Sequence, residues 1–119
     1  MDSRDFEFLS LLAYAHLKSG GAAAAADLLA GLQAVEPEHA WVNRTLAYAL
    51  LEAGRYEACL TQVERLPTVR QDKALQLIRS RALWALGRHA EARRAAAGLA
   101  DGVRGLGMPQ PASPQEAAG

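Results

Sequence analysis

The sequence has little of what an active site, a disulfide framework or a membrane span requires. Among its 119 residues there is one cysteine, Cys59, so no internal disulfide can form, and there are only three histidines. Thirteen basic and thirteen acidic residues cancel, and a neutral chain without a basic cluster is not typical of proteins that bind nucleic acid or anionic membranes. No apolar run approaches the roughly 18–20 residues that span a bilayer. With no signal peptide recognised in its first residues, we expect a protein of the cytoplasm.

The few reactive side chains form no constellation. No Cys or His pair has the spacing of a zinc site, and Gly20 and Gly21 lack the surroundings of a phosphate-binding loop. We expect His16 to be a core or half-buried packing residue and not a metal ligand. Cys59 stands at a position that demands a small side chain, which is not the accessible, electropositive setting of a reactive thiol. The sequence therefore predicts no enzyme activity, no cofactor and no metal site.

What the sequence does have is a periodic glycine. Gly20, Gly54 and Gly87 recur at spacings of 34 and 33 residues. A glycine ends a helix readily, and small residues on either side of it allow two antiparallel helices to approach closely. A 34-residue period with this pattern is the signature of tetratricopeptide (TPR) repeats. The small residues seven before and five after each glycine are Ala13 and Ala25, Ala47 and Cys59, and Ser80 and Ala92.

The predicted fold is all-α, with three TPR helix-turn-helix repeats in a short right-handed α-solenoid. The repeats are expected at about 6–38, 39–70 and 71–101, within a domain over 1–101, and a flexible, disordered Gly/Pro-rich tail is expected over 102–119. Helices are predicted from residue 3 to about 18, then over 22–35, 38–52, 56–66, 71–86 and 89–100. Helical spacing predicts the buried faces of the first two helices. They comprise Phe8, Leu9, Leu12, Ala13 and His16 in the first, and Ala25, Leu28, Leu29 and Leu32 in the second.

In such repeats the first helix of each pair lines the concave surface through positions 2, 5, 9, 12 and 13, with the glycine at position 15. Both tryptophans and two of the three tyrosines then fall on that surface, and exposed aromatics with arginines are typical of an interface hot spot. A partner's amphipathic helix would place apolar anchors on the aromatics and acidic residues beside the arginines. The predicted partner-binding residues are Tyr14, Leu17, Trp41, Arg44, Tyr48, Leu51, Leu77, Arg81 and Trp84.

A second interpretation of these aromatics stays open. Aromatic residues at helical spacing also occur in cores, and Trp41 and Trp84 could pack against neighbouring helices instead of facing a groove. We favour the groove. Tyr56, at position 17 of its repeat, is expected to pack between helices.

The chain resembles the small TPR chaperones of bacterial type III secretion, in particular the YscY-type chaperone that partners the secreted YscX-type protein. The resemblance spans residues 8–99 and is carried by Phe8-Leu9 and by the segments 28–32, 36–39 and 80–87. It implies a cytoplasmic, non-enzymatic chaperone that wraps a helical segment of its export partner and presents it to the cytosolic ring of the export gate. Independently of the resemblance, the sixth predicted helix is mostly alanine and is followed by glycine and proline, so either self-association or a bound partner is expected to cover the exposed side of the third repeat. The alternative is a generic TPR adaptor for another peptide, or for a different secretion subunit such as a needle protein.

Overall fold

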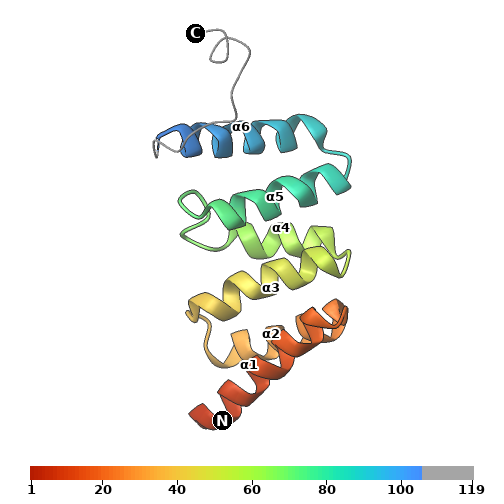
Figure 1. Cartoon of the computed structure of the whole chain (residues 1–119), viewed down its shortest axis with the longest axis vertical. Helices are drawn as coiled ribbons and strands as arrows, with labels where there is room; N and C mark the ends of the chain where they lie inside the picture. The colour runs from red at the N-terminus through yellow and green to blue at the C-terminus, as the bar shows by residue number, and fades with distance from the viewer. Residues whose placement is uncertain (106–119) are drawn as a thin grey trace, which may run out of the picture.

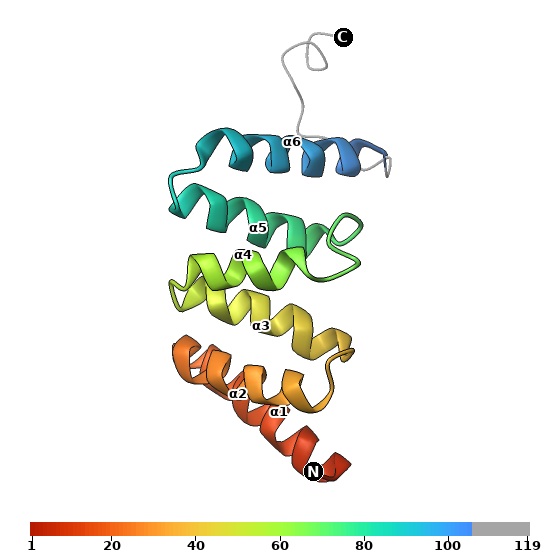
Figure 2. The same ribbon diagram turned by 180° about the vertical axis from the view of Figure 1, so that it is seen from behind.

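The computed structural model describes residues 1–105, with side chains through residue 99, and these residues form six helices and no strand. Figures 1 and 2 show the helices stacked in chain order from one end of the molecule to the other. Each helix packs on the next, and α3 also contacts α5. The arrangement is the predicted α-solenoid of three helical pairs. The helices are α1 (Ser3–Lys18), α2 (Ala22–Val35), α3 (Ala40–Glu52), α4 (Tyr56–Glu64), α5 (Lys73–Ala85) and α6 (His89–Gly105).

The three periodic glycines end α1, α3 and α5 in the same way. Gly20, Gly54 and Gly87 have φ of 88°, 75° and 81°, a left-handed conformation that glycine adopts without a steric cost. The amide of each glycine donates to a carbonyl three residues back, and the next amide donates to a carbonyl five residues back, as in Gly54 to Leu51 (3.0 Å) and Arg55 to Leu50 (2.9 Å). This pair of bonds is the Schellman motif. The short turns inside all three pairs therefore follow from local sequence, as predicted.

Small residues lie where paired helices cross, which confirms the predicted register. Ala13, Ala25, Ala47 and Cys59 have no accessible surface, and Ala92 has almost none. Larger aliphatic side chains fill the space on either side of these close approaches. The largest fully buried ones are Leu29, Leu32, Val42, Val63, Leu75 and Leu83.

The predicted helix ends hold to within a few residues, and capping explains the differences. Asp2 caps α1 by accepting a hydrogen bond from the Asp5 amide (2.9 Å). His39 caps α3, and Asp72 caps α5 by accepting from the Leu75 amide (3.2 Å). Both helices therefore begin one or two residues later than predicted, because the capping residue itself stays extended. At the end of its pair, α4 stops at Glu64, and Leu66 reaches the core from the following turn.

The buried face of α1 is rotated from the predicted one. Phe8 and Leu12, expected in the core, are 63% and 37% exposed, whereas Phe6 is only 8% exposed. The Phe6 ring packs against His39, with ring centroids 5.1 Å apart, so contact with the start of α3 decides which aromatic is buried. His16 is half-buried, as expected, and Leu28 is only partly buried.

The last helix extends further than the sequence suggested. α6 continues to Gly105 instead of ending at residue 100, so residues 102–105 of the predicted tail are helical. The rest of the predicted tail, 106–119, lies outside the described residues.

A polar cluster inside the stack was not predicted. The side-chain amide of Gln33 donates to Asn43 (2.9 Å) and to Gln62 (3.1 Å), and Gln62 donates to the Asn43 carbonyl (3.0 Å). Asn43 in turn donates to the carbonyl of Pro37 (2.8 Å). Asn43 and Gln62 are buried, and buried amides are tolerated only when they are paired in this way. The cluster joins α2, α3 and α4, so it fixes how the first two repeats stack.

Candidate functional site

Two hollows form one groove along α1 and α3, which we call the inner groove. One hollow, of about 350 Å³, lies between α1, α3 and the start of α5, and the other, of about 570 Å³, lies between the first half of α1 and the start of α3. Tyr14 and Trp41 line both, so the hollows adjoin each other. The first is lined by Tyr14, Leu17, Lys18, Trp41, Arg44, Thr45, Tyr48, Ala74, Leu75 and Ile78, and the second by Phe6, Glu7, Ser10, Leu11, Tyr14, His39 and Trp41.

Three aromatic side chains of the inner groove, Tyr14, Trp41 and Tyr48, are partly exposed and are not part of the core. Tyr14 on α1 and Tyr48 on α3 are 34 residues apart, so the repeat places them at equivalent points of neighbouring helices. Trp41, on the first turn of α3, is 40% exposed, and both tyrosines expose a similar fraction. Each ring is therefore partly packed against the protein and partly exposed to solvent, as is expected of a residue that anchors a partner.

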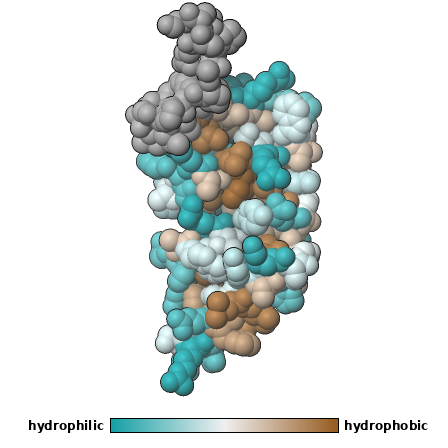
Figure 3. Space-filling view, in the orientation of Figure 1, coloured by the Kyte–Doolittle hydropathy of each residue, from teal (hydrophilic) through white to brown (hydrophobic). Residues whose placement is uncertain are grey.

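Figure 3 shows one face of the described molecule as a mixed surface. Hydrophobic residues, in brown, gather at the level of α1 and again at the level of α5, with paler residues at the level of α3 between them. Exposed large apolar side chains are present on all three of these helices. An apolar surface of this extent is typical of a protein-binding face.

The structure brings five of the nine predicted partner-binding residues together in the inner groove: Tyr14, Leu17, Trp41, Arg44 and Tyr48. Leu77, Arg81 and Trp84 are exposed but lie further along. Arg81 and Trp84 line a separate hollow of about 360 Å³ between α5 and α6. There the Trp84 indole stacks on the His89 ring, with centroids 4.0 Å apart.

The prediction for Leu51 was wrong. It is 6% exposed, belongs to the core and lines neither hollow. Leu17, its equivalent in the first repeat, is half-exposed and does line the groove. The two differ because α3 is packed against α2, α4 and α5, whereas α1 lies at the end of the stack.

Several lining residues were not predicted. Lys18 occupies position 13, one of the inward positions of the repeat, so the register contained the signal for it. Leu11, Thr45 and Ile78 share position 6, which was not considered to face inward. Glu7 occupies position 2, as Trp41 does in the next repeat, so the register contained the signal for it as well.

The charge of Arg44 is already neutralised within the chain. Its Nε lies 2.7 Å from Oδ2 of Asp72, and its Nη2 donates to Oδ1 at 3.3 Å. This two-point contact between α3 and the start of α5 has the fork geometry of a strong arginine–carboxylate pair. Arg81 lies 3.9 Å from Glu52, a much looser contact. The geometry of Arg44 therefore does not support the expectation that it pairs with a partner's acidic residue, because Arg44 already forms an ion pair with Asp72.

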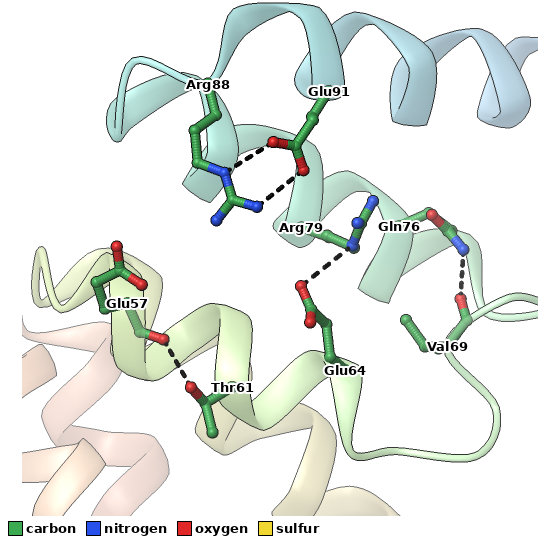
Figure 4. A network of polar contacts seen from close by, with 8 residues as sticks. All are labelled: Glu57, Thr61, Glu64, Val69, Gln76, Arg79, Arg88 and Glu91. Carbon is green, nitrogen blue, oxygen red and sulfur yellow. Dashed lines mark hydrogen bonds and ion pairs between the residues drawn. The ribbon is translucent and has the colours of Figure 1, made fainter.

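A further set of polar contacts lies along α4, α5 and the start of α6 (Figure 4). Arg88 donates to both carboxylate oxygens of Glu91 (2.9 and 2.8 Å), and Arg79 lies 3.7 Å from Glu64. Hydrogen bonding from Arg88 lowers the pKa of Glu91, and the same bond raises the pKa of Arg88. Both groups are exposed, so the pair adds little to stability. None of these residues lines the inner groove. The Arg79–Glu64 pair joins α5 to α4, whereas Arg88–Glu91 is a local contact at the start of α6.

The single thiol is packed as a small core residue. Cys59 has no accessible surface, and its Sγ lies 3.4 Å from the Ala47 carbonyl, to which it donates. Burial raises its pKa to about 11, so it stays protonated at neutral pH. Among the described residues, no group of His, Cys, Asp and Glu side chains could hold a metal ion, and no described helix is long and apolar enough to cross a membrane.

Comparison with known proteins agrees with this architecture. The family model of the tetratricopeptide repeat matches residues 16–81. The chain belongs to the tetratricopeptide-repeat family. No curated protein matches the sequence. TPR repeats are scaffolds for protein–protein interaction, and the inner groove of this TPR chain is where its described residues offer a surface for a partner.

Proposed function

We propose that this TPR protein is a cytoplasmic chaperone of type III secretion that holds a helical segment of a small YscX-type export protein in the inner groove. It then presents that protein to the cytosolic ring of the export gate. The observation that carries the proposal is the exposed aromatic lining of the groove, formed by Tyr14, Trp41 and Tyr48. The resemblance of residues 8–99 to the YscY-type chaperones supplies the partner.

A helix suits the groove better than an extended strand. An amphipathic helix presents apolar side chains at i, i+3, i+4 and i+7, in a row along one face. The groove offers aromatic and aliphatic contacts along two helices, and neither hollow is deep or enclosed. An extended peptide would leave backbone amides and carbonyls unpaired against these apolar walls, whereas a helix satisfies its own backbone groups.

The second candidate function is a TPR adaptor for another peptide or for a different secretion subunit, such as a needle protein. An adaptor would use the same groove, so the two candidate functions differ only in the identity of the partner. If the YscX-type protein does not bind while another helical segment does, the adaptor function replaces the export chaperone.

The test is co-expression of the full chain with the YscX-type protein encoded in the same genome, followed by co-purification. Saturating partner at 100 times its dissociation constant should add about 2.7 kcal/mol to the free energy of unfolding. Trp41→Ala and Tyr48→Ala should each weaken binding by at least ~2 kcal/mol and leave folding nearly unchanged. Phe8→Ala is the matched control, because Phe8 is an exposed aromatic on α1 outside the inner groove. Loss of stability without loss of binding in the groove variants would favour the core interpretation of these aromatics.

A further inference from the structure

Three charged side chains line the inner groove: Glu7, Lys18 and Arg44. Arg44 is held by Asp72. Within the part of the chain that the structure describes, neither Glu7 nor Lys18 forms an ion pair. The ammonium group of Lys18 lies 5.9 Å from the centre of the Tyr14 ring, and that contact leaves its charge uncompensated. The groove therefore carries one acidic and one basic group that are available to a partner.

These two groups stand at opposite ends of the groove on one face of α1. Glu7 lines the hollow beside the start of α3, and Lys18 lines the hollow that reaches α5. Residues 7, 11, 14 and 18 follow the 4-3-4 spacing of a single helix face, with Leu11 and Tyr14 between the two charges. At 1.5 Å per residue, the charges are separated by roughly 16 Å along the axis of α1. The groove is thus apolar in the middle, negative at one end and positive at the other.

Helices of ordinary composition carry a complementary polarity. Acidic residues are favoured in the first turn of a helix and basic residues in the last turn, because both offset the helix dipole. A helix of three turns or more could place its first turn beside Lys18 and its last turn beside Glu7. In that direction it runs antiparallel to α1, so the dipoles of the two helices also attract.

The geometry points to directional docking: the inner groove binds an amphipathic helix antiparallel to α1, with its acidic first turn at Lys18 and its basic last turn at Glu7. This inference rests on the proposed binding of a helix in the groove. It adds the direction of the partner and the charges that the partner carries at its two ends.

The probes are two synthetic helical peptides with the same apolar stripe. The acid-first peptide has Glu in its first turn and Lys in its last turn, and the base-first peptide has these charges exchanged. Titration against the full chain at low salt, followed by tryptophan fluorescence, gives both dissociation constants. We expect the acid-first peptide to bind at least about five times more tightly, and the preference to fade as salt screens the exposed charges.

Exchanging the charges on the protein controls for any difference in affinity that comes from the peptides themselves. In the variant Glu7→Lys with Lys18→Glu, the preference should reverse in favour of the base-first peptide. Glu57→Lys with Arg94→Glu is the matched control, because it makes the same two charge changes at residues that line neither hollow, and its preference should stay that of the wild type. Lys18→Glu alone should weaken binding of the acid-first peptide but not of a version with Gln in place of its first-turn Glu. That result would show that the first turn of the peptide lies beside Lys18.

If the wild type and the charge-exchanged variant prefer the same peptide by the same factor, the inference is overturned. If both peptides bind equally and Tyr48→Ala weakens both, the groove binds helices without direction, so the inference falls and the proposed function stands. If neither peptide binds, the inference falls as well, and co-purification with the YscX-type protein then decides the proposed function separately.

Discussion

Enlarging Ala47 tests the packing on which the repeat architecture depends. Ala47 is fully buried on α3, and its carbonyl accepts the hydrogen bond from the Cys59 thiol on α4 at 3.4 Å. Cys59 is itself fully buried, so there is no free space into which a larger side chain could turn. Ala47→Leu adds three carbon atoms at this crossing. Overpacking of a tight core usually costs roughly 1–3 kcal/mol, and we expect a loss of about 2 kcal/mol in the free energy of unfolding.

Urea denaturation followed by far-UV circular dichroism and tryptophan fluorescence measures this loss. With a denaturant slope of about 1–3 kcal/mol per molar urea, the midpoint should fall by about 1 M. Ala30→Leu is the matched control, because Ala30 is exposed on α2 and the same substitution there should change stability by no more than about 0.5 kcal/mol. Equal midpoints for Ala47→Leu and Ala30→Leu would refute the assignment of Ala47 to a tight helix crossing.

Two other properties of the fold can be tested in the same way. Gly54→Ala should destabilise by about 1–2 kcal/mol because φ is +75° there, although nothing lies within 4 Å of the added methyl group. Gly31→Ala, within α2 and with equally open surroundings, should stabilise the fold by about 0.5–1 kcal/mol. If both substitutions change the free energy of unfolding in the same direction, the turn geometry at Gly54 is contradicted. Cys59 should react with iodoacetamide at pH 8 only after unfolding. Since burial raises its pKa from 9.0 to about 11, the unfolded chain loses this proton first, and stability should fall as the pH rises from about 9 through 11. Cys59→Ala should remove that part of the decline, and an identical pH dependence in both proteins would contradict the raised pKa.

Sequence alone determined the features of this protein that depend on neighbouring residues. Each helical pair turns at a glycine because the Schellman motif needs a left-handed residue three and four positions after the two carbonyls that it satisfies. The small residues at fixed distances from that glycine, such as Ala13 and Ala25, define where the paired helices cross. These are local requirements repeated every 33 or 34 residues, so they could be predicted together with the fold class. The repeat register also predicted that Tyr14, Trp41 and Tyr48 lie on one exposed surface.

Only the tertiary structure decided which residues on an apolar helix are covered and which charges are free. Periodicity gives the angles between side chains around a helix, but not which neighbour packs on each side. Phe6 is buried in place of Phe8 because the start of α3 lies against it. Leu51 is buried while its repeat equivalent Leu17 lines the groove, because α3 has helices on more sides than α1. The pairing of Arg44 with Asp72 joins residues 28 positions apart, and among the residues that the structure describes it leaves Glu7 and Lys18 as the unpaired charges of the groove. Such contacts depend on how the repeats stack, and no local pattern in the chain encodes them.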